Sequence, residues 1–442
     1  MLELVSPTWS RGDNVTVTLL YNESHTIYPP RRGGPLFPFR GKGNVTHSYT
    51  PLALKPRPRD GACINEGETV AAHRTQIGAA FAALSATTLA VTVSAAAPGV
   101  AQTSVGQANP VALITGAKSI NSTEERYDIK GTDLGIMWTD DRGRILAAFG
   151  DTFGAGWTGV DSGFARPTEI DWRSNTLARS TDRNPSDGMS FDNYVSDRPG
   201  HAKELLPSLK KEGVETTKIP TGGININGRN YLAYMSVRKF TEPGHWITNY
   251  SGVAYSDDGG QSWKDAPSAR RPNTAALDNT FQMIAYARGD RYVYAFGTPN
   301  GRFGAAHLAR VREDQLLDNS AYEYWTGRGW ERGSSTIASP IVPGPVGELS
   351  VRFDKTLNNW EMMYLDESRK AIVLRLAPRP TGPWSAEIPV ATANEYPDLY
   401  GGFLNPDSDG PDLYFTMTQY KAYNVMIMHA KLPASVIRAA KH

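Results

Sequence analysis

The sequence is short of cysteine: its 442 residues include one, Cys63. Disulfides within the chain are therefore excluded, and its stability has to come from packing. Net charge is also nearly absent, because 46 Lys and Arg residues are balanced by 45 Asp and Glu residues to give +1. This balance argues against nucleic acid or another polyanion as a partner.

The motifs of several enzyme classes are missing as well. The eight histidines show no HExxH pattern and no paired spacing, so we expect no metal site and no cofactor. No G-x-S-x-G motif occurs, which argues against an α/β-hydrolase. The segment TGAKS at 115–119 lacks the glycine that directly precedes the lysine of a phosphate-binding loop, and we interpret it as a surface loop.

The first hundred residues carry the features of an exported protein. Residues 1–69 are rich in Pro and Arg and lack sustained periodicity, and we interpret them either as a start-site error, with a valine-coded start at Val70, or as a disordered extension. Residues 70–101 place basic residues before an alanine-rich apolar run that ends in small residues, the layout of a signal peptide cleaved after Ala101. A retained membrane anchor is the alternative, but Ser and Thr interrupt the run and no basic stop-transfer flank follows it. We therefore expect a protein that is secreted or associated with the cell envelope.

Helical periodicity is scarce after residue 110, whereas hairpin signals recur. In each hairpin a small or polar group precedes an apolar strand, a polar turn follows, and a second apolar strand returns. The five hairpins cover residues 131–154, 221–237, 281–298, 346–366 and 400–420. Polar residues that recur at the same strand end favour a β-propeller over a β-sandwich, because the innermost strands of a propeller all start around one central funnel. We predict an all-β, five-bladed β-propeller over residues 110–442.

The segment SDDGGQSW, from Ser256 to Trp263, supports this fold independently. It fits the Asp-box pattern S-x-D-x-G-x-[ST]-W of sialidase-type propellers, in which the aspartate bonds turn amides and the tryptophan packs beneath the turn. That motif is structural, so we expect no chemistry from Asp258 or Trp263.

The first hairpin carries the candidate catalytic residues. A three-residue turn of Asp141, Arg142 and Gly143 would pair Asp140 with Arg144 and would set Asp133 directly opposite Asp151. Two neighbouring carboxylates resist ionising together, which gives one acid and one base. The alternative is that strand-end aspartates only cap turns.

A ring of further side chains would surround this pair if the hairpins are blades. The predicted substrate-binding residues are Gly150, Phe153, Thr221, Gln282, Arg302, Glu348 and Tyr400. Gly150 lacks a side chain and would let a ligand approach the backbone. Glu348 would bind sugar hydroxyls or tune the pKa of an aspartate, and its alternative role is a structural pair with an arginine such as Arg352.

Several segments together resemble one family over residues 110 to 442. They are KGTDLGIMW, AFGDTFG, PTGGI, WITNYSGVAYSDDGGQSW, FGTPNGRFGAAHLARV, GPVGELSVRF and LYGGF. The chain is similar to bacterial proteins of domain-of-unknown-function family 4185, now recognised as a glycoside hydrolase family of endo-D-arabinanases. This resemblance implies a five-bladed propeller, internal cleavage of D-arabinofuranose chains in mycobacterial-type arabinogalactan and lipoarabinomannan, and essential carboxylates at Asp133 and Asp151.

We therefore expect a monomeric glycosidase whose partner is cell-wall D-arabinan, with Asp133 as acid and Asp151 as base. We also expect inversion at the anomeric carbon, because an open funnel leaves room for a water beside the base. A lectin-like propeller that binds arabinan without cleaving it is the first alternative. A sialidase is the second, and it would need an arginine cluster drawn from residues such as Arg166, Arg173 and Arg302.

Overall fold

The computed structural model describes residues 108–160, 169–274 and 280–440. The upstream extension, the predicted signal peptide and Cys63 lie outside these ranges. Strands dominate the described residues, and the α-helices among them are α1 (Thr123–Tyr127) and α3 (Ala434–Ala440). None of the described helices has both the length and the hydropathy needed to cross a membrane. The all-β prediction is confirmed.

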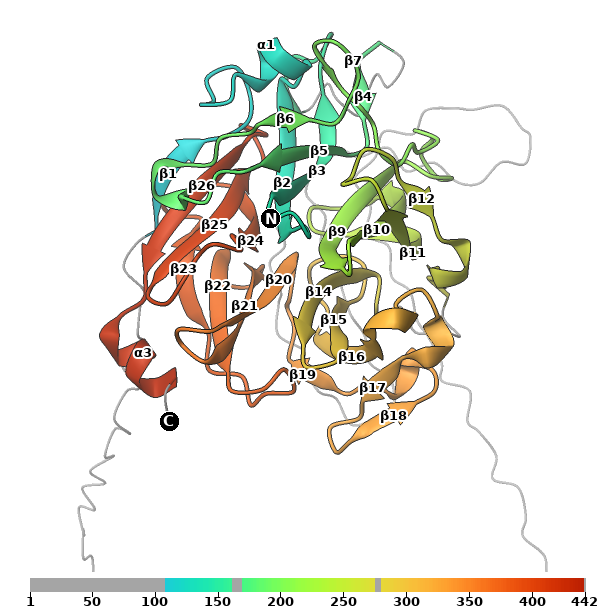
Figure 1. Cartoon of the computed structure of the whole chain (residues 1–442), viewed down its shortest axis with the longest axis vertical. Coiled ribbons are helices and arrows are strands. Elements are labelled where there is room, and N and C mark those ends of the chain that lie inside the picture. Colours follow the sequence, from blue (N-terminus) through green and yellow to red (C-terminus); the bar gives the residue numbers. More distant parts are fainter. Residues whose placement is uncertain (1–107, 161–168, 275–279, 441–442) are drawn as a thin grey trace, which may run out of the picture. The chain divides into compact units, whose positions relative to one another are not determined.

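Five antiparallel sheets form the blades of the propeller (Figure 1). Blade 1 contains β2 (Gly131–Thr139), β3 (Ile145–Phe153), β5 (Thr176–Ser180) and β6 (Asn193–Tyr194), with β4 (Trp172–Arg173) beside β3. Blade 2 contains β9 (Thr217–Ile226), β10 (Arg229–Phe240), β11 (Trp246–Ser256) and β12 (Lys264–Asp265), with β13 (Arg271–Pro272) beside β11. Blade 3 contains β14 (Met283–Gly289), β15 (Tyr292–Thr298), β16 (Ala306–Arg312), β17 (Glu323–Trp325) and β18 (Trp330–Arg332), with β19 (Pro340–Val342) beside β16.

The remaining blades complete the ring. Blade 4 contains β20 (Leu349–Asp354), β21 (Asn359–Asp366), β22 (Ala371–Ala377) and β23 (Ile388–Thr392). Blade 5 contains β24 (Leu399–Leu404), β25 (Asp412–Gln419), β26 (Val425–Lys431) and β1 (Asn109–Leu113). Outside the blades, β7 (Ser196–Arg198) and β8 (His201–Ala202) pair as a short antiparallel ribbon. Because β1 pairs with β26, the first described strand closes the last blade.

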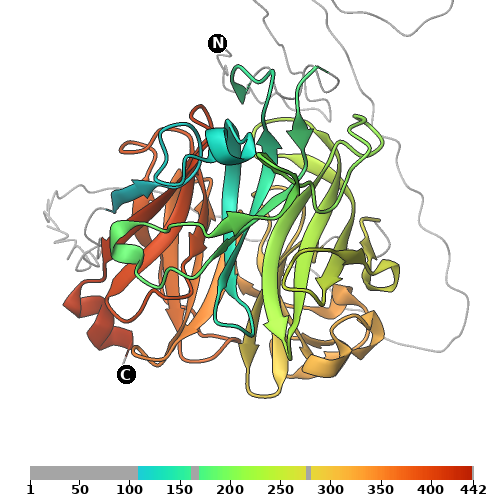
Figure 2. The same cartoon turned by 45° about the horizontal axis from the view of Figure 1, so that its top comes forward.

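The first strand of each blade lies innermost. Strand β2 contacts β9 and β24, β9 contacts β14, and β20 contacts both β14 and β24, so these five strands form a closed ring. All five begin at the same end of the ring, which we call the funnel end. Figure 2 shows α1 at the rim of this end, where β2 begins. The predicted five-bladed propeller is confirmed.

Turn residues explain why these strands pair as they do. Asn227 and Gly228 have φ angles of 52° and 86°, the left-handed pair that joins β9 to β10. Gly143 has a φ of 75° in the turn between β2 and β3, and Asp140 N donates to Arg144 O at 2.8 Å, as predicted. The third hairpin turns at Asp290, which has a φ of 54°.

Packing between blades supplies the core. Every residue of β3 and of β21 is buried, which agrees with apolar residues on both faces of covered sheets. The Asp box also forms: Asp258 Oδ1 accepts from the backbone N–H groups of Gln261 at 3.0 Å and Ser262 at 2.9 Å. Burial opposes ionisation there, but hydrogen bonds from Ser262 and its neighbours lower the pKa of Asp258 to about 2. Trp263 packs edge-on against Trp138 at a centroid distance of 6.4 Å, so the box is structural.

Candidate active site

Asp133 and Asp151 both lie at the funnel end, Asp133 near the start of β2 and Asp151 near the end of β3. The predicted register holds on either side of them, since Thr132 pairs with Thr152 and Thr139 with Ile145. Between these pairs the register shifts twice, so the direct Asp133–Asp151 pairing that we predicted is wrong.

A bulge formed with blade 5 causes the shift. Leu134 and Gly135 have φ angles of 71° and 86°. Their backbone is bonded to β25, because Leu134 N donates to Thr418 Oγ1 at 3.2 Å and Thr416 Oγ1 donates to Gly135 O at 3.0 Å. The bulge therefore moves the Asp133 backbone out of the β3 ladder.

The two oxygens of the Asp133 carboxyl have different neighbours. Its Oδ2 accepts from the Tyr400 hydroxyl at 3.0 Å. Its Oδ1 is buried and has no hydrogen-bond donor within the described part of the chain. A Cβ atom at Gly150 would lie 2.2 Å from this Oδ1, so the missing side chain of Gly150 makes room for Asp133 rather than for a ligand as we predicted.

The surroundings of Asp133 favour its protonated form. Burial, followed by the negative charge of Asp151, raises its pKa to about 8, and hydrogen bonds from Tyr400 and Tyr423 only partly oppose this. Asp133 therefore retains a proton at neutral pH.

Asp151 lies in a more polar environment. Its side chain belongs to a residue that is 2% exposed, and its Oδ1 accepts from Trp172 Nε1 at 2.7 Å and from Thr217 Oγ1 at 2.5 Å. Burial raises its pKa to about 7, while these two hydrogen bonds and the charge of Lys210 hold it below that of Asp133. Between about pH 7 and pH 8, Asp133 is therefore protonated and can act as an acid, while Asp151 is ionised and can act as a base.

Three of the predicted ring residues form a network beside Asp133. Arg302 Nη2 donates to Glu348 Oε1 at 2.8 Å, and Arg302 Nη1 donates to Glu367 Oε1 at 3.2 Å. The guanidinium also lies over the Tyr400 ring, 5.0 Å from its centroid. Glu348 thus pairs with Arg302 and not with Arg352, the partner that we considered, and its charge contributes to the raised pKa of Asp133.

The other predicted ring residues do not line the funnel wall. Phe153 is 0% exposed and stacks on Trp157 at 5.9 Å with an interplanar angle of 3°. Gln282 is 1% exposed, and its amide accepts from Thr248 Oγ1 at 2.7 Å and donates to Arg271 O at 3.1 Å. Both side chains therefore serve packing between strands, where a substrate does not reach them.

Thr221 lies too far from the start of β9 to face the funnel end. Its Oγ1 donates to Ile284 O at 3.1 Å, and it lines a cavity of about 580 Å³ with residues near the far ends of the inner strands, such as Trp138 and Arg288. The funnel residue of blade 2 is Thr217, at the start of β9. We missed it because the segment TKIPT has no strand-like alternation and contains a proline.

Two further residues near Asp151 come from outside the first hairpin, and they were not predicted from the sequence. Trp172 comes from the two-residue strand β4, and Lys210 lies with its Nζ 5.3 Å from the centroid of the Trp172 ring. Neither lies in a periodic segment, so only the fold brings them to the aspartate.

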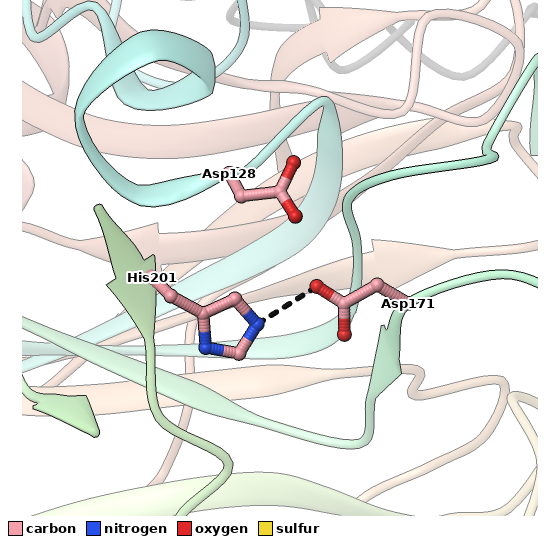
Figure 3. A group of neighbouring side chains, drawn as sticks. All are labelled: Asp128, Asp171 and His201. Atoms are coloured by element: carbon pink, nitrogen blue, oxygen red, sulfur yellow. Dashed lines mark hydrogen bonds and ion pairs between the residues drawn. The ribbon is translucent and has the colours of Figure 1, made fainter. Parts of the chain in front are cut away.

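Figure 3 shows a second cluster of titratable side chains, formed by Asp128, Asp171 and His201. Candidate ligand atoms of Asp128, Asp171 and His201 all lie within 4.8 Å of one another. His201 Nε2 is 2.8 Å from Asp171 Oδ2, and Arg173 Nη2 is 3.3 Å from the same oxygen. The buried guanidinium of Arg173 also donates to Asp128 O. Since Arg173 already supplies positive charge here, these contacts describe an ion-pair network, and we assign no metal to it.

The two described arginines of the sialidase alternative are bonded to separate groups. Arg173 donates to Ala202 O at 3.1 Å, whereas Arg302 is held by its two glutamates. Arg166 lies outside the described residues.

Comparisons with known proteins give one family and several more distant structures. Residues 118–429 match the model of the family described as "Domain of unknown function (DUF4185)". "Notoamide biosynthesis cluster protein J" of Aspergillus sp. (strain MF297-2) is 33% identical over 314 residues, which are 67% of this chain and 81% of the relative. A Bacteroides ovatus protein provisionally named a hydrolase is 14% identical, with a TM-score of 0.48, over 70% of this chain and 87% of its own. A family 117 glycoside hydrolase of Zobellia galactanivorans is 13% identical, with a TM-score of 0.46, over 76% of this chain and 92% of its own.

Proposed function

This chain belongs to the DUF4185 family, and we propose that it is a secreted, endo-acting glycoside hydrolase that cleaves D-arabinofuranosyl linkages in cell-wall arabinan. The observation that carries the proposal is the pair of neighbouring carboxyls at the funnel end, with the pKa of Asp133 raised to about 8 and that of Asp151 to about 7. Keeping two acids close together in a poorly solvated site is costly, and glycosidases use such a pair as acid and base.

In the proposed reaction Asp133 donates its proton to the departing glycosidic oxygen as the C1–O bond breaks. Asp151 accepts a proton from the water whose oxygen forms the new bond to C1, so the sugar is released with an inverted anomeric carbon. Trp172 and Thr217 hold the Asp151 carboxylate by its Oδ1 and leave its other oxygen for the water. The Tyr400 hydroxyl contacts Oδ2 of Asp133 and orients this carboxyl.

The choice of D-arabinan and of internal cleavage rests on the resemblance of the motifs around Asp133 and Asp151 to those of endo-D-arabinanases. The name of the Aspergillus relative places that protein in a notoamide biosynthesis cluster and mentions no arabinan. Substrate choice within the family therefore has to be measured for each member. Export rests on the signal-peptide pattern of residues 70–101 and is tested by the N-terminal sequence of the mature protein.

Incubation of the purified protein with mycobacterial arabinogalactan tests the proposal. We expect a ladder of arabino-oligosaccharides by anion-exchange chromatography, and no products from a linear L-arabinan, whose sugars have the opposite hand. Release of free arabinose alone would refute the endo mode. Binding of arabinogalactan without release would refute the enzyme and favour the lectin.

A further inference from the structure

An exposed aromatic pair lies on the rim of the funnel end. Phe303 is 48% exposed and lies in the loop between β15 and β16. It stacks on His245, from the loop between β10 and β11, with a centroid distance of 4.3 Å and an interplanar angle of 19°. Both loops belong to the funnel end, because β10 and β15 finish where their partners β9 and β14 begin.

A backbone hydrogen bond joins the two loops. Arg302 N donates to Gly244 O at 3.0 Å, and within the first loop His245 N donates to Glu242 O at 2.8 Å. Gly244 and Gly301 have φ angles of 76° and 84°, which allow the close approach of the two chains. The stacked rings thus lie on two loops that are hydrogen-bonded to each other, and they are partly preorganised for a ligand.

The aromatic pair is connected to the candidate acid. Arg302, the neighbour of Phe303 in the chain, lies over the ring of Tyr400, whose hydroxyl donates to Asp133. A Cβ atom at Gly244 would lie 3.2 Å from Phe303 Cε2 and 3.3 Å from Glu367 Oε1, so aromatic and carboxylate groups converge there. Arg302 of blade 3 and Tyr400 of blade 5 therefore link the aromatic pair to Asp133.

The chemistry of this surface suits a neutral sugar. The face of an aromatic ring is electron-rich and attracts the C–H groups on the face of a sugar ring. The positive charge of Arg302 is already neutralised by Glu348 and Glu367, which leaves it poorly placed to hold an acidic sugar. We infer that His245 and Phe303 form a subsite that stacks one neutral sugar of the glycan chain away from the scissile bond. The inference rests on the proposed function, and it adds a place where the protein binds the glycan away from the scissile bond.

Kinetics of Phe303→Ala on arabinan chains of increasing length test the subsite. Loss of one stacking contact should raise KM roughly three- to tenfold for long chains and leave kcat within about twofold. KM for the shortest cleaved oligosaccharide should not change, because that substrate does not reach the platform. Phe303→Tyr should restore the parent KM, since it keeps the aromatic face.

Phe353→Ala is the matched control. Phe353 is 38% exposed and lies on β20, where it lines the cavity at the far ends of the inner strands. We expect it to leave KM unchanged for every chain length. An unchanged KM for Phe303→Ala on long chains, or an equal rise in KM for both alanine variants, would overturn the inference while leaving the proposed hydrolase intact.

A second readout separates failure of the subsite from failure of the function. If the parent protein binds arabinogalactan but cleaves nothing, the hydrolase fails, and weaker binding by Phe303→Ala but not by Phe353→Ala would still support the subsite. If the parent protein neither binds nor cleaves arabinogalactan, both the proposed function and the subsite are refuted.

Discussion

Replacing Asp133 by Asn should stabilise the protein more at pH 7 than at pH 5. In the unfolded chain the carboxyl loses its proton near its ordinary pKa of 3.8, whereas in the folded protein it holds the proton up to about pH 8. Between these values the folded state binds one more proton, so the free energy of unfolding falls as pH rises, by about 1.4 kcal/mol per pH unit. Stability from this group is complete below pH 3.8 and is lost progressively up to about pH 8.

The size of the expected stability change follows from the pH interval that is compared. Two pH units, from 5 to 7, correspond to about 2.7 kcal/mol, which Asp133→Asn should recover at pH 7 relative to pH 5. Effects of the substitution that do not depend on pH, such as a changed hydrogen bond to Tyr400, cancel in this comparison. At roughly 2 °C per kcal/mol for a large domain, the melting temperature of the variant relative to the parent should rise by about 5 °C between the two pH values.

Thermal unfolding of the parent and the variant at pH 5 and pH 7 measures this shift. Asp314→Asn is the control, because the Asp314 side chain is 72% exposed and stays in water in both states. We expect its melting temperature to differ from that of the parent by the same amount at both pH values. If Asp133→Asn behaves like this control, burial does not oppose ionisation of Asp133 and the assignment of the acid is unfounded.

Three further predictions concern turnover. Activity should follow a bell-shaped pH profile, rising to about pH 7 as Asp151 loses its proton and falling above about pH 8 as Asp133 loses its own; a flat rate from pH 5 to 9 would contradict these roles. Glu348→Gln should lower kcat by about tenfold, less than either aspartate substitution, and should move the alkaline limb to lower pH because Glu348 contributes to the raised pKa of Asp133; undiminished activity would make Glu348 purely structural. Proton NMR of the first reducing ends should show the inverted anomer, whereas the anomer of the substrate or transfer to added methanol would refute single displacement.

The blades could be predicted because their signals are local. Each hairpin is encoded by apolar strands and by turn residues such as Asn227 and Gly228, whose left-handed backbone specifies a tight turn. The same locality placed Asp133 and Asp151 at one end of one hairpin, since Gly143 sets the register at the turn.

The details of the site depend on contacts between distant segments. The bulge at Leu134 is held by Thr418, which is 284 residues away in the chain, and no pattern within the first hairpin indicates it. The Arg302–Glu348 pair joins blades 3 and 4, so its partner could not be chosen from sequence spacing. Thr217 was missed because its strand begins with a segment that lacks alternation.

Product release from arabinogalactan by the parent protein, Asp133→Asn and Asp151→Asn tests the central claim most directly. The three proteins should be compared at equal concentration and pH 7.5, with binding of the polymer measured in parallel. We predict that the parent releases oligosaccharides, and that each variant binds the polymer but is slower by at least about a thousandfold, because each lacks one of the two proton-transfer groups. Release by both folded variants at a rate close to that of the parent would contradict the assignment of Asp133 and Asp151 as the catalytic pair.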